Sequence, residues 1–118
     1  MTDREELEIA VKALDSKKAT NITVLKVDDL TILANYFVIA SASSTTQVKA
    51  LADEVEYQLG LKNVQPKNIE GYTSRTWIIL DYIDVVVHVF NDEARDFYQL
   101  ERLWADGTPV DIKEFIKE

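Results

Sequence analysis

Hydrophobic and polar residues follow one another in this chain with two distinct periods, and each period predicts a kind of element. Apolar residues recur every three to four positions in residues 2–14 and again after residue 46, which is the pattern of helices with one buried face. Thr2 and Glu5 have capping-box spacing at the start of the first helix. The second helix follows a hydroxyl-rich run over residues 41–46, and Gly60 is placed at its C-terminal cap.

Strand patterns occupy most of the remaining chain. Residues 21–27 predict a strand in which Ile22 and Val24 point one way and Thr23, Leu25 and Val27 the other, and residues 36–40 form the continuous apolar run of a central strand. A short strand is predicted near residues 67–69. Residues 76–90 predict a β-hairpin that turns at residues 81–84 and buries at least one face.

Alternation along this hairpin separates its side chains into two faces. Trp77 and Ile79 share a face with Asp81, while Ile78, Leu80 and Tyr82 share the other. In the second strand, Asp84, Val86, His88 and Phe90 lie on one face, and Val85, Val87 and Val89 lie on the opposite one. If only one face meets the helices, Trp77 either fills a second core or anchors a partner.

A last helix is predicted over residues 92–104, with residues 105–109 ending it and a short strand and turn in the tail. The strand at Phe37, the helix at Gln47 and the strand at Trp77 predict a right-handed β-α-β unit, to which the hairpin adds an antiparallel strand. The fold class is therefore α/β: one domain over residues 1–118, with a mixed β-sheet and helices packed on it.

Charge and composition narrow the function classes. The 21 acidic and 13 basic residues give a net charge of −8, which disfavours direct nucleic-acid contact and suits a basic partner. The absence of cysteine excludes disulfides, thiolate metal sites and thiol nucleophiles. We expect a cytoplasmic protein without membrane contact, because neither a signal peptide nor an apolar run of about 20 residues is present.

Catalytic chemistry has little support in the sequence, and no cofactor is expected. Nucleotide-binding glycine motifs and zinc motifs are absent. Asp81 and Asp84 flank the hairpin turn and offer oxygen ligands for Mg²⁺, so the alternative function is Mg-dependent nucleotide binding or nucleotidyl transfer. His88 is the only histidine, and a structural role is favoured for it over catalysis.

The C-terminal aromatic residues point instead to docking. One helix cannot bury Phe97, Tyr98 and Trp104 on a single narrow stripe, so at least one of them faces outward. Exposed aromatic side chains beside Arg95 and Arg102 have the composition of a protein interface.

Six blocks carry a resemblance to a known family over nearly the whole chain. They are K-A-T-N-I-T-V-L-K-V, A-N-Y-F-V-I-A-S-A-S-S, Q-V-K-A-L-A-D-E-V, E-G, W-I-I-L-D-Y-I-D-V-V-V-H-V-F and R-x-F-Y-x-L-E-x-L-W. The chain resembles the ribosomal silencing factor (Iojap-like) family. The resemblance implies a fold similar to nucleotidyltransferases without their catalytic motif, and a translational repressor rather than an enzyme.

The same resemblance implies the partner and the contact set. Members bind the large ribosomal subunit through ribosomal protein L fourteen, block joining of the small subunit, and also form homodimers. The partner-binding residues implied here are Trp77, Asp81, Tyr82, Asp84, Arg95, Phe97, Tyr98, Glu101 and Trp104.

Four positions depart from the family pattern. Asn21 and Asn35 stand where Asp is common, and Thr46 stands where Arg is common, so salt bridges at these sites are in doubt. Ile83 replaces the usual turn glycine, which predicts a turn without positive φ because a β-branched residue would be strained there.

Overall fold

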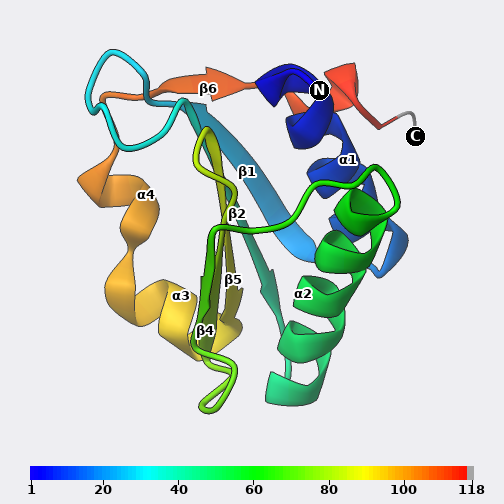
Figure 1. Ribbon diagram of the computed structural model, residues 1–118. Helices are drawn as coiled ribbons and strands as arrows, with labels where there is room; N and C mark the ends of the chain where they lie inside the picture. The colour runs from blue at the N-terminus through cyan, green and yellow to red at the C-terminus, as the bar shows by residue number, and fades with distance from the viewer. Residues whose placement is uncertain (117–118) are drawn as a thin grey trace.

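A six-stranded mixed sheet organises the protein, with helices on both faces (Figure 1). The computed structural model describes residues 1–116. The helices are α1 (Asp3–Ser16), α2 (Thr45–Gly60), α3 (Asp92–Tyr98) and α4 (Leu100–Leu103), followed late in the chain by a 3-10 turn, η1 (Ile112–Glu114). The strands are β1 (Thr20–Lys26), β2 (Tyr36–Ala42), β3 (Asn68–Glu70), β4 (Trp77–Asp81), β5 (Val85–Asn91) and β6 (Thr108–Val110). The predicted fold class is confirmed.

The helix ends show how local sequence sets the element boundaries. Thr2 and Glu5 form the predicted capping box at the start of α1. The prediction for Gly60 is wrong, because this residue is the last of α2 and not a left-handed cap. Asn63 takes the left-handed conformation instead, with a φ of +62°. Its N–H donates to the carbonyl of Gly60, which satisfies an acceptor at the end of the helix.

The strand order corrects the predicted β-α-β unit. Its two parallel strands are β2 and β5, whereas β4 lies on the far side of β5 and runs antiparallel to it. The predicted pairing of the Trp77 strand with the Phe37 strand is therefore wrong. The reason is that β5 is buried on both faces, because packed side chains cover it on each side of the sheet, whereas β4 buries alternate residues and lies next to the edge strand β3.

Two cores lie on opposite faces of the sheet. The larger lies under α1 and α2 and includes Ile78, Leu80 and Tyr82. The smaller lies under α3 and α4, with Phe37, Phe90 and Leu100 at its centre. Both predicted faces of the hairpin are confirmed, and Trp77 belongs to the second one. No helix in the described part of the chain is both long and apolar enough to cross a membrane.

The edges of the sheet are short. β3 at one edge and β6 at the other each have three residues, and Pro109 lies within β6.

At the end of the sheet near the N-terminus, Nδ2 of Asn35 donates to Oδ2 of Asp3 at 2.9 Å, a bond that an aspartate at position 35 could not donate.

The turn between β4 and β5 corrects a second prediction. Ile83 has a φ of +74°, in the left-handed region that its branched Cβ disfavours. The conformation is held because the N–H of Ile83 donates to Oδ1 of Asp81 at 2.8 Å and the N–H of Tyr82 donates to the Val85 carbonyl at 2.9 Å. The turn thus needs positive φ even without glycine.

Changing Ile83 to glycine is expected to raise the free energy of unfolding by about 1 kcal/mol. Relief of left-handed strain, about 1–2 kcal/mol, outweighs the greater backbone entropy of glycine in the unfolded chain. Urea denaturation followed by circular dichroism measures the change. Ile83→Ala removes the same exposed aliphatic surface but leaves a Cβ, so it should recover only part of the gain. Equal stability of the two variants would contradict the strain.

A candidate docking face

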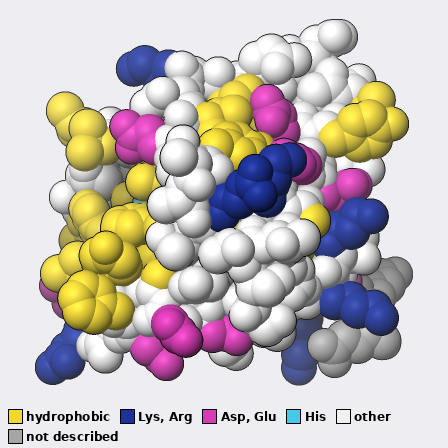
Figure 2. Space-filling view, turned by 90° about the horizontal axis from the view of Figure 1, so that it is seen from below, with side chains coloured by type: hydrophobic (Ala, Val, Ile, Leu, Met, Phe, Trp, Pro, Cys, Tyr) yellow, Lys and Arg dark blue, Asp and Glu magenta, His cyan; other side chains and the backbone are white. Residues whose placement is uncertain are grey.

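Exposed apolar side chains gather on one side of the molecule. Among residues 1–116, seven of the ten exposed large hydrophobic side chains belong to three segments that border the second core. These seven are Leu30, Ile32, Leu33, Ile83, Phe97, Tyr98 and Leu103. Figure 2 shows hydrophobic side chains gathered over the side that carries α3 and α4. We call this surface the docking face, because exposed apolar patches of this kind mark interaction sites.

The break between α3 and α4 shapes this face. The predicted helix over residues 92–104 is wrong as a continuous element, because Gln99 has a φ of +47° and interrupts it. The turn at Gln99 lets Leu100 enter the second core while Phe97 stays 80% exposed and Tyr98 48% exposed. The prediction that at least one aromatic residue of this segment faces outward is confirmed.

An aromatic cluster forms the floor of the docking face. Trp77 stacks on Phe90 with ring centroids 4.8 Å apart, and Tyr98 lies against Trp77 at the same separation. Phe97 meets Tyr98 edge-on at 5.1 Å. Trp104 is half-buried against Phe37 at 4.9 Å. The aromatic residues therefore support one another, and the outermost rings remain open to solvent at low entropic cost.

His88 fixes the indole of Trp77. The Nε1–H of Trp77 donates to Nδ1 of His88 at 3.1 Å, which places the imidazole proton on Nε2. His88 is buried, as expected of a structural histidine, but its Nε2 has no hydrogen-bond partner within the described residues. Burial lowers the pKa of His88 to about 4, because the surrounding rings cannot solvate an imidazolium.

Acid is expected to destabilise the protein through this histidine. The unfolded chain, with a histidine pKa near 6.5, binds the proton before the folded protein does, so stability is full above pH 6.5 and falls as the pH drops towards 4. The loss reaches roughly 3 kcal/mol when both states are protonated. Urea denaturation between pH 7 and 4 measures it. His88→Gln should flatten this part of the profile, and an unchanged slope in that variant would assign the loss to other groups.

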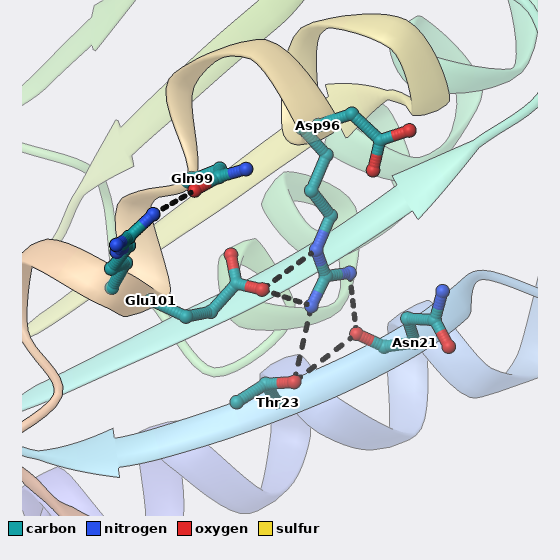
Figure 3. A pocket seen from close by; sticks show the side chains of 7 residues that line it. Asn21, Thr23, Asp96, Gln99 and Glu101 are labelled. Carbon is teal, nitrogen blue, oxygen red and sulfur yellow. Dashed lines mark hydrogen bonds and ion pairs between the residues drawn. The ribbon is translucent and has the colours of Figure 1, made fainter.

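Arg95 lies at the polar end of the docking face, among the side chains that line the groove drawn in Figure 3. Its buried guanidinium donates to the carbonyls of Thr20 and Asn21 and to the hydroxyls of Thr23 and Ser41. Both Nε and Nη2 approach Oε2 of Glu101 at 3.4 Å. Every nitrogen of the guanidinium is thus used within the protein, and it ties α3 and α4 to the bulge where β1 departs from regular pairing with β2.

A polar groove of about 480 Å³ lies beside this network, lined by Asn21, Thr23, Arg95, Asp96, Gln99, Glu101 and Arg102. Side chains of both charges line it, and the Arg95 guanidinium is already engaged by acceptors within the protein. Asn21 contributes its backbone carbonyl and a φ of +50°, which asparagine tolerates well. The loss of a charged side chain at position 21 therefore leaves the arginine network intact.

The acidic candidates lie at the opposite end of the face. Asp84 is exposed, and Asp81 is half-buried with one carboxylate oxygen occupied by the turn. Residues 1–116 contain no group of three or more ligating side chains that could hold a metal ion. Tyr82 is buried among the residues under α1 and α2, on the other face of the sheet from Trp77.

The structure thus separates the predicted contact residues into three groups. Trp77, Phe97, Tyr98 and Trp104 come together on the docking face, whereas Arg95 and Tyr82 are buried beneath it or behind it. Asp81, Asp84 and Glu101 lie around its margin. The sequence analysis did not predict that Ile32 and Leu33 belong to this face. They form an apolar pair between two predicted strands, and no periodic pattern there indicates whether the pair is buried or exposed.

Comparison with known proteins gives consistent matches over the whole chain. A family profile described as "Ribosomal silencing factor during starvation" matches residues 1–118. The chain is 38% identical to a ribosomal silencing factor from Bacillus subtilis, covering 95% of each chain. It is 36% identical to one from Halalkalibacterium halodurans, covering 98% of this chain and 99% of the relative. A crystal structure of a Chromobacterium violaceum protein superposes with a TM-score of 0.87 at 37% identity, covering 89% of this chain and 88% of the other.

Proposed function

Since the chain belongs to the ribosomal silencing factor family, we propose that it binds the large ribosomal subunit through ribosomal protein L fourteen and prevents the small subunit from joining. The observation that carries this proposal is the docking face, where Phe97 and Tyr98 extend from a supported aromatic cluster. A basic ribosomal protein suits an acidic chain of net charge −8.

The mechanism we propose is steric. A domain bound at the surface where the two subunits meet occupies space that the small subunit needs, so repression requires affinity and bulk but no bond rearrangement. Interfaces of this kind derive most of their affinity from a few well-packed aromatic side chains. Trp77, Phe97, Tyr98 and Trp104 have that role in our proposal.

The other predicted contact residues lie at the margin of the docking face or beneath it. Asp81, Asp84 and Glu101 provide an acidic rim that steers a basic partner and fixes its orientation. Arg95 and Tyr82 support the face from inside the protein. Their direct contact with a partner stays an untested prediction, and their burial favours the supporting role.

The family is one of ribosomal silencing factors and not of enzymes. The alternative of nucleotide chemistry at Asp81 and Asp84 would require Mg²⁺-nucleotide binding, and calorimetry with millimolar ligand tests it. We propose a cytoplasmic location, where ribosomes are assembled and used. A homodimer formed through the aromatic cluster of the docking face is a further proposal, which a mass measurement across protein concentrations would detect.

Co-sedimentation with purified large and small ribosomal subunits tests the main proposal. We expect the protein to pellet with the large subunit alone and to reduce the yield of joined ribosomes when added before the small subunit. Adding it after joining should have a weaker effect, because the contact surface is then covered. Absence from both pellets would overturn the proposal, and binding without an effect on joining would overturn the steric mechanism.

A further inference from the structure

An exposed aliphatic loop, residues 28–35, forms one end of the docking face. Ile32 is fully exposed, with a relative accessibility of 102%, and Leu33 is 75% exposed. Leu30 is also exposed, so three of the four aliphatic residues in this loop lie in water. The fourth, Ala34, is buried in the second core. Figure 1 shows the loop extending beyond the end of the sheet, on the side that carries α4.

Hydrogen bonds fix the loop in this shape. The N–H groups of Leu30 and Thr31 donate to the Val27 carbonyl at 2.9 and 3.1 Å, and the N–H of Leu33 donates to Oγ1 of Thr31 at 3.1 Å. At its far end, the N–H of Asn35 donates to the Asp84 carbonyl at 2.8 Å. A loop held in this way presents its aliphatic side chains without a large entropic cost when a partner binds.

The surroundings of the loop are acidic. The chain contains no lysine or arginine between Lys26 and Lys49, and none between Arg75 and Arg95. The loop itself carries Asp28, whose carboxylate pairs with Nζ of Lys26 at 3.8 Å, and Asp29, which forms no ion pair within residues 1–116. The adjacent turn carries Asp81 and Asp84. The hydrogen bonds to the Asp84 carbonyl place these two segments side by side. The aliphatic side chains are therefore set among carboxylates.

We infer that the aliphatic loop inserts into an apolar cleft rimmed by lysine or arginine on a basic protein, and that Ile32 and Leu33 are the residues that enter it. The inference rests on the proposed function, since it adds a second contact to the same docking event. Charge complementarity selects this occupant. A second copy of this chain would bring an equally acidic rim against the first, and the two rims would repel each other. An anionic membrane surface would repel the carboxylates of the loop in the same way.

The test compares two double variants in binding to purified large ribosomal subunits. Ile32→Ser with Leu33→Ser removes the inserted side chains. Tyr57→Ser with Leu61→Ser removes one large side chain from the last turn of α2 and one from the residue that follows it, each 60% exposed, and serves as the matched control. We expect the loop variant to bind about 30-fold more weakly, as for the loss of a hot spot, and the control to stay within about twofold. Both should unfold at the same urea concentration as the parent protein, because the side chains are exposed.

A second variant tests the acidic rim. Asp28→Asn with Asp29→Asn should slow association with large subunits and make binding less sensitive to salt, because opposite charges then steer the encounter less strongly. An unchanged salt dependence would overturn the charge argument.

The outcomes separate this inference from the proposed function. Loss of binding in Phe97→Ala with full binding in the loop variant would overturn the inference and leave the proposed function standing. No binding of the parent protein to large subunits would overturn both. If the loop variant lost self-association but kept subunit binding, the occupant would be a second copy and the inference would be wrong.

Discussion

Replacing Arg95 with leucine is expected to lower the free energy of unfolding by about 4 kcal/mol. The change leaves the carbonyl oxygens of Thr20 and Asn21 and the Glu101 carboxylate without the donor that satisfies them. Thr20 and Asn21 are exposed, so water can replace the donor there. The buried hydroxyl of Ser41 and the partly buried Glu101 carboxylate lose this donor without replacement, at a cost of about 1–3 kcal/mol each. Urea denaturation monitored by circular dichroism gives the difference. Arg95→Lys should restore little of the lost stability. The compact ammonium group of lysine cannot reach all the acceptors that surround the planar guanidinium of Arg95.

Arg102 offers a matched control for this experiment. It lies in α4, is exposed, and donates only to Oε1 of Gln99 at 3.3 Å. Arg102→Leu removes the same charge and should change stability by no more than about 0.5 kcal/mol. Equal losses in the two leucine variants would show that net charge matters and the buried network does not.

Removing the two outermost aromatic side chains together, Phe97→Ala with Tyr98→Ala, is expected to weaken large-subunit binding by about 4 kcal/mol, close to a thousandfold. Each ring is exposed in the free protein and would be buried by a partner, and a hot spot contributes about 2 kcal/mol or more. Titration of labelled protein with purified large subunits measures the change.

The double variant needs a check on folding, because Tyr98 also touches Trp77 and Phe90. Its near-ultraviolet circular dichroism should retain the signal of the remaining aromatic cluster. Tyr57→Ala on α2 removes an aromatic ring from a part of the surface outside the docking face and should bind normally. Weaker binding in both proteins would point to a general loss of solubility or fold.

The fold class could be predicted from the sequence because the periodic elements are long. α1 and α2 have apolar stripes and hydroxyl caps, and the two faces of β4 and β5 follow from alternation. The strand order could not, because two consecutive apolar strands do not show which of them pairs with β2. That choice depends on the burial of both faces of β5, which only the assembled sheet reveals.

Two further predictions are wrong because a residue other than glycine adopts the left-handed conformation. Gln99 and Ile83 are residues that rarely adopt positive φ, so no rule based on residue type would place a helix break at one and a strained turn at the other. The aromatic part of the docking face could be predicted, because three large rings cannot share one stripe. The loop at Ile32 and Leu33 could not, because exposure of an unpatterned apolar pair depends on which neighbours pack over it.

The three-residue strands at the two edges of the sheet restrict how this protein can associate. A partner that added a strand would gain few backbone hydrogen bonds at β3, and Pro109 removes a donor at β6. Backbone pairing is indifferent to sequence, so an open edge would accept many extended peptides. Because both edge strands are short, a partner must be recognised by side chains. Evolution can then change the partner by substituting single surface residues, without altering the sheet.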